Sequence, residues 1–353
     1  MASVIDYSGL TLNEQEAVEV SQAVFEGVYV KGELDRFHAI QTGVKMKTQI
    51  PFFGLLPMLG KVSSGCTPNA ATGLSLSEKY WEPTLIDFRL THCQADVNQL
   101  YKMWERATKA LDIWENMDSA QMNFIVSRAV DAHKEAIMRI TAFGDTAAEV
   151  VGSGGYLTAG VDKTYFNMLS GLWKQIFTAV SATTVHRYTI DENAQASKAA
   201  QLALADTRAH DVMKDLYEQI DPRAFEAGTL KYQLTRSLVN NWWALLEDKS
   251  LANAVMNRVE DKPTPLSYRG IPIEVRYDWD RNILANHDLS TTYYLPHRAI
   301  LTPIENIPIG TSDEESMSDC DSFYDKKDKS WYYDGASMFD VKLLEEHNIA
   351  VAY

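Results

Sequence analysis

The spacing of hydrophobic residues near the start of the chain predicts a helical arm and then a hairpin. A capping box, Thr11-Leu12-Asn13-Glu14, is followed by apolar residues at mostly helical spacing, which predicts a short N-terminal helix. Glycines and prolines then interrupt residues 41–84 too often for any long helix. Residues 44–47 and 74–77 alternate with period two, as the arms of a hairpin do.

Helical spacing returns at residue 90 and continues through the middle of the chain. A seam with 3-4-3-4 spacing predicts a helix formed around Leu90, Cys93, Val97, Leu100, Trp104, Ala107, Leu111 and Trp114. A second helix is predicted over 119–143, with Gly144 as a left-handed stop, and residues 152–155 predict a flexible joint. Three more helices are predicted, over 164–181, 192–220 and 237–247.

Alternating patterns dominate the last third and predict strands. Two stretches alternate cleanly, at Ile271, Ile273, Val275 and Tyr277 and at Ile349, Val351 and Tyr353. Residues 322–324 and 331–333 flank a charged turn and predict a hairpin. Helices in the middle and strands at the end together predict an α+β fold, and the sequence has no fixed-period repeat.

Composition narrows the function classes. The chain has 353 residues, 46% of them hydrophobic, which is typical of a folded protein with two domains or one domain with insertions. With 33 Lys and Arg against 48 Asp and Glu, the formal charge is −15. Because nucleic-acid affinity comes mostly from basic residues, this charge disfavours sequence-specific DNA binding.

The sequence also disfavours a membrane or secreted location. The longest apolar run, residues 50–59, contains two prolines and is shorter than the roughly 20 residues that a membrane span needs. The first six residues have neither a basic start nor a long apolar stretch, so we expect no secretion signal. We therefore expect synthesis in the cytoplasm and no contact with a membrane.

Candidate catalytic and metal-binding residues are few. The three cysteines lie far apart, and Cys93 beside His92 falls on the apolar seam, which favours a structural role. The best metal-like cluster is Asp278, Asp280, His287 and Asp288, which we interpret as solvated residues after a strand. The glycines at 152–155 lack the Lys-Ser/Thr of a phosphate-binding loop, and the acidic run at 313–321 does not match a calcium loop. We predict no enzyme, no catalytic residue, no cofactor and no metal.

The apolar loop is the informative feature. A protruding hairpin with alternating arms and glycine-marked ends fits burial of its tip on another subunit, although the loop could also fold back on its own core. Each large side chain contributes about 1.5–3 kcal/mol when fully buried, comparable in sum to the cost of association. The predicted subunit-interface residues are Ile50, Phe52, Phe53, Leu55, Leu56, Met58 and Leu59.

The order of these parts resembles the tailed-bacteriophage major capsid protein, with the Hong Kong 97 fold. Residues 268–275, Tyr-Arg-Gly-Ile-Pro-Ile-Glu-Val, are similar to a "Gly-hydrophobic-Pro-hydrophobic" strand of that family. Residues 296–302 and 306–311 resemble the strand and loop that lead to its closing sheet. A narrower resemblance, to capsid proteins of crAss-like and related phages, rests on Gly43, Pro51, Gly54, Gly60, Cys66, Glu78, Lys79, Trp81, Pro83, Cys93, Asp96, residues 143–145 and residues 171–173.

The resemblance implies a division of the chain into five parts. These are an N-terminal arm (1–43), an extended loop (44–84), a peripheral domain (85–155) with a spine helix over 119–143, an axial domain (156–294), and a return to the peripheral domain (295–353). It also implies that the chain forms pentamers and hexamers of an icosahedral virion capsid around double-stranded DNA, without sequence-specific binding. Portal, decoration or scaffold proteins would be its other partners.

Three alternatives remain at the level of sequence. An encapsulin-type compartment shell protein shares the implied fold but encloses cargo enzymes. A cytosolic metal-dependent enzyme would use Asp278, Asp280 and His287. A monomeric binding module would grip a partner peptide with its apolar loop.

Overall fold

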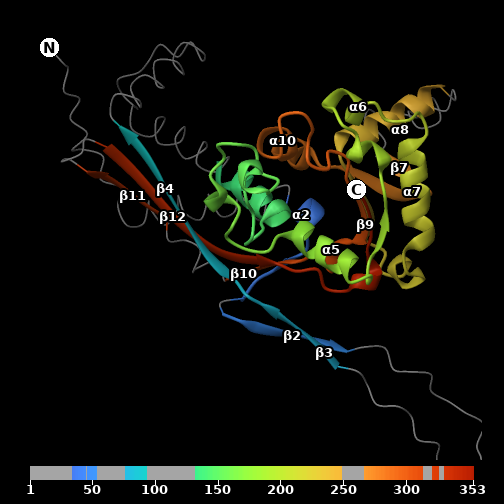
Figure 1. Cartoon of the computed structure of the whole chain (residues 1–353). Coiled ribbons are helices and arrows are strands. Elements are labelled where there is room, and N and C mark those ends of the chain that lie inside the picture. Colours follow the sequence, from blue (N-terminus) through green and yellow to red (C-terminus); the bar gives the residue numbers. More distant parts are fainter. Residues whose placement is uncertain are drawn as a thin grey trace, which may run out of the picture.

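The computed structural model describes residues 34–44, 46–53, 76–93, 132–248, 266–312, 320–325 and 330–353. These residues form a body of helices around a six-stranded sheet, beside a second sheet of long strands (Figure 1). A two-stranded hairpin projects from the junction of the two sheets. The mixture of helix and sheet confirms the predicted fold class.

The six-stranded sheet, called the central sheet below, has the strand order β5-β13-β9-β6-β8-β7. Its strands are β5 (His186–Tyr188), β13 (Ala350–Ala352), β9 (Ala299–Pro303), β6 (Leu230–Leu234), β8 (Ile271–Val275) and β7 (Ser267–Tyr268). Every residue of β9 and β13 is buried. Because strands covered on both faces need no polar side, they have nearly continuous apolar sequences.

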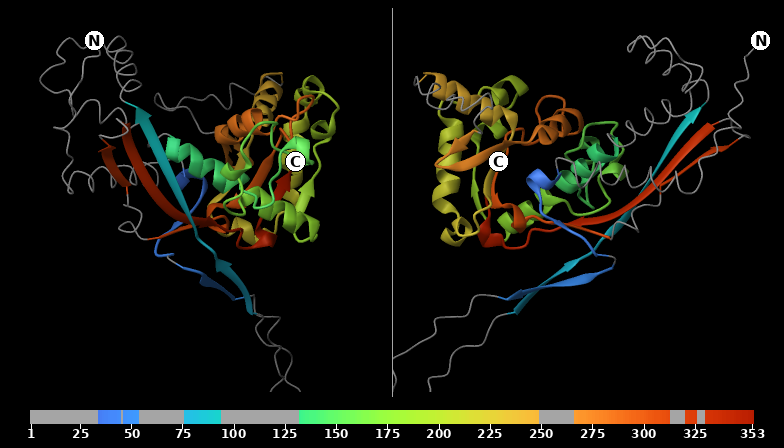
Figure 2. Two further views of the ribbon diagram at one scale, coloured as in Figure 1. Left: turned by 60° about the vertical axis from the view of Figure 1, so that its left-hand side comes forward. Right: turned by 180° about the vertical axis from the view of Figure 1, so that it is seen from behind.

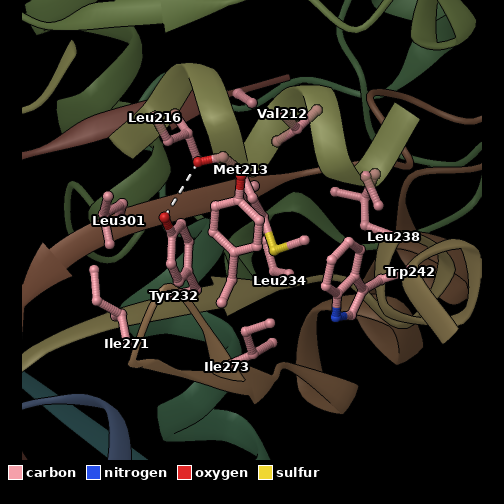
Figure 3. Packing of buried hydrophobic residues seen from close by; sticks show 14 of the residues in the cluster. Val212, Met213, Leu216, Tyr232, Leu234, Leu238, Trp242, Ile271, Ile273 and Leu301 are labelled. Atoms are coloured by element: carbon pink, nitrogen blue, oxygen red, sulfur yellow. Dashed lines mark hydrogen bonds between the residues drawn. The ribbon is translucent and has the colours of Figure 1, made fainter. Parts of the chain in front are cut away.

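Helices cover both faces of the central sheet. On one face, Ala299 and Leu301 of β9 belong to an apolar cluster with residues of α7 and α8. On the other face, Ile300 belongs to a second cluster with residues of α5 and α10. Figure 3 shows the first cluster, in which the Tyr232 hydroxyl donates a hydrogen bond of 3.1 Å to the Met213 carbonyl. Successive side chains of β9 therefore point to opposite faces of the sheet and pack in different apolar clusters.

The helices of the body are mostly short. They are α5 (Leu172–Ser181), α6 (Lys198–Leu202), α7 (Arg208–Gln219), α8 (Arg236–Asp248) and α10 (Tyr277–Asn286), and residues 132–143 are also helical. Single 3₁₀ turns are η2 (Val151–Ser153), η3 (Lys163–Tyr165), η4 (Asp191–Ala194), η5 (Pro222–Phe225), η6 (Ile304–Asn306) and η8 (Glu346–Asn348).

The second sheet, called the extended sheet below, has the order β1-β10-β12-β11, and β4 also pairs with β12. Its strands are β1 (Ile40–Gln41), β10 (Ile309–Thr311), β12 (Ser330–Val341), β11 (Cys320–Asp325) and β4 (Thr84–Cys93). The β11–β12 pairing confirms the predicted hairpin near residues 322–333. β4 runs antiparallel along β12, from the pair Thr84 and Phe339 to the pair Cys93 and Ser330.

The helix predicted to start at Leu90 is wrong for the residues that the structure describes. Leu90 and Cys93 lie in β4, and residues 94–131, which hold the rest of the seam, lie outside the described residues. Both a strand and a helix fit so short a window, because Ile86, Phe88 and Leu90 also recur with period two in the sequence. Leu85 is 61% exposed and Ile86 is 7% exposed, as a half-buried strand requires.

Two predicted helices are shorter than their patterns indicated. The helix predicted over 164–181 begins only at Leu172, after the N-cap Gly171. The helix predicted over 192–220 divides into η4, α6 and α7. The backbone of Ala203 leaves the helical region at the end of α6, which breaks the second pattern. The helix predicted over 237–247 is confirmed as α8.

Gly144 ends the helix of residues 132–143, but not as a left-handed stop, because its φ is not positive. A Cβ atom at Gly144 would lie 2.6 Å from both the Ile140 and the Leu169 carbonyl oxygens. Gly171 is equally confined, since its Cβ would lie 2.6 Å from the Gly144 nitrogen. The two glycines therefore let the end of this helix and the start of α5 approach each other closely. Of the spine helix predicted over 119–143, residues 119–131 lie outside the described residues.

The glycines at 152–155 form a tight turn rather than an open joint. Gly154 has a φ of 83° and caps η2, and its amide donates to the Val151 carbonyl. A Cβ atom at Gly155 would lie 1.9 Å from the Glu149 carbonyl oxygen. Both glycines are therefore required by the local backbone.

Candidate functional site

The projecting hairpin joins β2 (Thr48–Phe53) to β3 (Leu76–Trp81) (Figure 2). The strands are antiparallel, and their register runs from the pair Thr48 and Trp81 to the pair Phe53 and Leu76. Its two strands pair with each other and, among the described residues, with no third strand. The predicted hairpin is confirmed, although its first arm begins at Thr48 rather than at residue 44. Residues 54–75, which join the strands, lie outside the described residues.

The seven predicted interface residues fall partly on this hairpin. Ile50, Phe52 and Phe53 lie in β2, and Ile50 is half-buried. Leu55, Leu56, Met58 and Leu59 lie outside the described residues. The assignment of these side chains to a subunit interface therefore stays a prediction.

Polar contacts fasten the base of the hairpin to the body. The Lys79 ammonium donates to the Leu343 carbonyl at 2.8 Å and lies 3.3 Å from the Glu346 carboxylate. The Glu82 amide donates to the Asp340 carboxylate at 2.8 Å. Lys342 pairs with Asp340 at 3.0 Å, yet burial raises the pKa of the Asp340 carboxyl above its ordinary value. The hairpin is thus held by groups from the end of β12 and the segment after it.

The start of the described chain contacts both the extended sheet and the body. Helix α2 (Leu34–Phe37) is followed by His38, and Leu34, Phe37 and His38 are buried. β1 then pairs in parallel with β10, Ile40 opposite Ile309. The segment therefore adds a strand to the extended sheet and buries the side chains of Leu34, Phe37 and His38.

A buried arginine organises this docking. Arg276 forms two hydrogen bonds to the Asp278 carboxylate, at 2.9 and 2.8 Å, and one of 2.6 Å to the Gln233 amide oxygen. Its guanidinium lies 4.2 Å from the centre of the Phe37 ring. Gln233 in turn donates to the Phe37 carbonyl at 3.1 Å. Since Arg276 and Asp278 are both buried, each satisfies a charge that would otherwise destabilise the fold.

His38 lies in the same network. Its Nδ1 is 2.9 Å from the Ile307 carbonyl and its Nε2 is 3.4 Å from an Arg276 nitrogen. Burial chiefly, and the Arg276 charge, lower the pKa of His38 to about 3. The imidazole is therefore neutral in the folded protein at physiological pH.

The acidic residues proposed as a metal site have other partners. Asp278 is bound to Arg276, and the Asp280 carboxylate accepts the Arg236 amide at 2.8 Å, at the start of α8. Both lie in the first turn of α10, so the interpretation as solvated turn residues is wrong for Asp278, which is buried. Burial also raises the pKa of Asp280 to about 6.

His287 and Asp288, the other two residues of the proposed metal cluster, also have different partners. The buried His287 ring stacks on Tyr156, with 5.4 Å between the ring centres, and the tilted Phe143 ring lies 4.9 Å away; burial holds the pKa of His287 well below its ordinary value. Asp288 forms an ion pair of 2.7 Å with Lys198. Within the described ranges no group of three His, Cys, Asp or Glu side chains could hold a metal ion.

Cys93 and His92 lie in β4, where they pair with Ser330 and Trp331 of β12. Cys93 therefore belongs to a strand and not to the helical seam that the sequence predicted.

The sequence analysis assigned no anchoring role to the residues that attach the hairpin and the N-terminal segment. Trp81 and Lys79 contact segments more than 200 residues away in the chain. Arg276 fell inside the alternating stretch from Ile271 to Tyr277 that predicted a strand, whereas it lies between the end of β8 and the start of α10. Such contacts have no fixed spacing, so only the fold reveals them.

No protein-family model and no curated protein matches the sequence. Among solved structures, a chain of the satellite phage P4 procapsid, a structure that includes the size determination (Sid) protein, is similar with a TM-score of 0.52. The identity is 14%, and the match covers 99% of this chain and 91% of that chain. The fold is that of a phage procapsid chain.

Two further solved structures have weaker similarity. A chain of Gordonia phage Cozz has a TM-score of 0.48 and 10% identity, over 91% of this chain and 85% of that chain. A virus-like particle from Pyrococcus furiosus has a TM-score of 0.44 and 9% identity, over 95% and 98%. Of these three matches, the one to the P4 procapsid chain has the highest TM-score and covers 99% of this chain.

Across the described part of the chain, no helix has the length and apolarity to cross a membrane. The five-part division implied by the capsid resemblance stays a prediction, as do its boundaries.

Proposed function

We propose that this chain is a major capsid protein, the structural subunit of a tailed-phage head. The observation that carries the proposal is the match of almost the whole chain to the fold of the P4 procapsid chain. The projecting β2–β3 hairpin supports it, because a two-stranded ribbon has little stability alone and is stabilised by packing against another surface.

In this proposal, copies of the chain form pentamers and hexamers of an icosahedral virion capsid that encloses double-stranded DNA. The hairpin of one copy lies over its neighbour and buries the apolar residues between Ile50 and Leu59. Contacts of this head-to-tail kind close into rings when the rotation between copies allows it. The sequence motifs favour placement among crAss-like and related phages, and portal, decoration or scaffold proteins are the proposed partners.

The net charge of −15 suits such a wall. A shell that bound DNA tightly would hinder both packing and release of the genome, and an acidic surface repels phosphates. Purified subunits are therefore expected to show no tight, salt-sensitive DNA binding, and such binding would contradict this part of the proposal.

Negative-stain microscopy and light scattering of the purified protein test the proposal directly. We expect rings or closed particles, with nuclease-protected DNA in particles taken from infected cells. A protein that stays monomeric at high concentration would refute the proposal. Particles filled with protein cargo would instead favour the compartment shell.

A pair of variants tests the role of the hairpin tip. Leu55→Ser combined with Leu56→Ser removes apolar surface from the tip and is expected to raise the concentration needed for assembly at least tenfold. Leu284→Ser is the matched control, because Leu284 lies on α10 and is already 53% exposed. Equal assembly of both variants would show that the tip is not an interface.

A further inference from the structure

The last residue of β3 packs against a glycine of the extended sheet. Trp81 is 1% exposed, although it belongs to the projecting hairpin. Gly310 lies in the middle of β10, opposite Asp340 of β12. A Cβ atom added at Gly310 would lie 2.7 Å from Cε3 of the Trp81 indole and 2.9 Å from both Cδ2 and Cζ3. The indole thus approaches the β10 backbone more closely than any residue except glycine allows.

The glycine serves this contact and not the backbone conformation. The φ of Gly310 is not positive, and the residue lies in a regular strand that pairs with both β1 and β12. Any amino acid can adopt such a conformation. A larger residue at this position would instead overlap the space that the Trp81 indole occupies.

The space over the Gly310 backbone that the indole fills is called the notch below, and packing alone holds the indole there. Its Nε1 is buried and has no hydrogen-bond partner among the described residues. On either side in the chain, Lys79 is tied to Leu343 and Glu346, and the Glu82 amide to Asp340. Three positions within four residues therefore anchor the hairpin, and Trp81 is the only one of the three that does so by packing.

Because Trp81 lies at the base of the hairpin, a small rotation there moves the far end of the hairpin by a larger distance. The described part of β3 runs five residues outward from Trp81, which is about 17 Å at the rise of a strand. A tilt of about 10° at Trp81 would move the far end of the strand by about 3 Å, and more at the tip beyond it. Displacements of that size exceed what a close-packed interface tolerates.

We propose that Trp81, seated in the notch at Gly310, is a positioning residue that sets the direction in which the β2–β3 hairpin leaves the body. That direction decides whether the hairpin meets the surface of a second copy. This inference rests on the proposed function, since it explains how one copy is prepared for assembly with the next.

Gly310→Ala tests the proposal with a single methyl group. The added Cβ pushes the indole out of the notch and tilts the hairpin, so we expect the concentration needed for assembly to rise at least tenfold. Gly152→Ala is the matched control, because a Cβ there meets nothing within 4 Å and φ is not positive. If wild-type protein assembles and Gly310→Ala assembles equally well, the inference is wrong; if wild-type protein never assembles, the proposed function itself fails.

A second variant separates positioning from loss of fold. Trp81→Phe removes Cε3 and Cζ3, two of the three indole atoms that the new methyl group would meet, so combining it with Gly310→Ala should restore part of the assembly. The single Trp81→Phe change leaves a gap beside glycine and should weaken assembly. A double variant that assembles no better than Gly310→Ala would overturn the proposal.

A distance measurement keeps the test decisive even if Gly310→Ala folds poorly. Spin labels at Gln49→Cys on the hairpin and Leu284→Cys on the body, with the three native cysteines changed to serine, report the hairpin direction. Both positions are exposed. We expect a shifted or broader distance distribution in Trp81→Phe and none in Gly152→Ala, and identical distributions would refute the inference.

Discussion

The central sheet and the extended sheet differ in how they bury their apolar side chains. The central sheet has strands of two to five residues with helices on both faces, and two apolar clusters meet along β9 and β13. The extended sheet has strands of up to 12 residues, and its buried residues Ile86, Ile309 and Phe339 belong to neither cluster. The first region is built around its own core, whereas the second reaches away from that core and carries the hairpin.

The difference shows how the surroundings of a strand determine its sequence. Residues 299–301 are consecutive apolar residues, because both faces of β9 are covered. Residues 85–87 alternate between exposed and buried, because one face of β4 is open. Changes in the central sheet should therefore act on stability, and changes around the extended sheet should act on assembly.

The largest effect on stability is expected from Trp173→Ala in α5. Trp173 is 1% exposed, its ring centre lies 5.1 Å from that of Trp279, and the Arg298 guanidinium lies 4.8 Å from its ring. Its removal leaves a cavity, so the free energy of unfolding should fall by about 3–5 kcal/mol. Urea denaturation of unassembled protein measures the change. Leu284→Ala is the exposed control, and a loss below about 1 kcal/mol at Trp173 would contradict a core of this kind.

An intermediate, pH-dependent effect is expected where the N-terminal segment joins the two regions. His38 is neutral in the folded state, with a pKa of about 3, but takes up a proton in the unfolded chain below its ordinary value of 6.5. Its contribution to stability is therefore present above pH 6.5 and is lost as the pH falls towards 3. The slope should be about 1.4 kcal/mol per pH unit within that window.

His38→Gln should reduce that slope while retaining a donor near the Ile307 carbonyl. The groups facing His38 are Arg276 and Asp278, and both stay in the variant. Denaturation curves between pH 6 and 4 give the slope, and His347→Gln, at an exposed position, serves as the control. Equal slopes for His38→Gln and the wild type would show that His38 titrates as an ordinary histidine.

The smallest change in stability is expected from Lys79→Met at the base of the hairpin. The pair with Glu346 is partly exposed, so unfolding of the body should change by less than about 1 kcal/mol. Amide exchange in Thr48–Phe53 should nevertheless become faster, because the hairpin loses one of its anchors. Lys163→Met breaks an exposed pair with Glu149 on the body and should leave hairpin exchange unchanged. Equal exchange in the two variants would show that Lys79 does not hold the hairpin.

Local patterns predicted most of the elements that depend on neighbouring residues. The hairpins at 48–81 and 320–341 and the helix α8 follow from alternation or helical spacing. The helix predicted from Leu90 failed because Leu90 and Cys93, the first two residues of the seam, lie in β4, whose ten-residue pairing with β12 outweighs helical propensity. For the candidate site, the sequence indicated the hairpin and its apolar tip but not the contacts by which Lys79, Trp81 and Glu82 anchor it.

What the sequence determined by itself was the character of each segment, because helical or alternating spacing, turn glycines and net charge act over a few residues or over the whole surface. What the tertiary structure decided was which distant residues meet. Gly310 is indistinguishable from a turn glycine until Trp81 lies against it, and Asp278 looks like a solvated carboxylate until Arg276 binds it inside the body. Close packing and the pairing of buried charge are satisfied only between segments that the folded chain brings together.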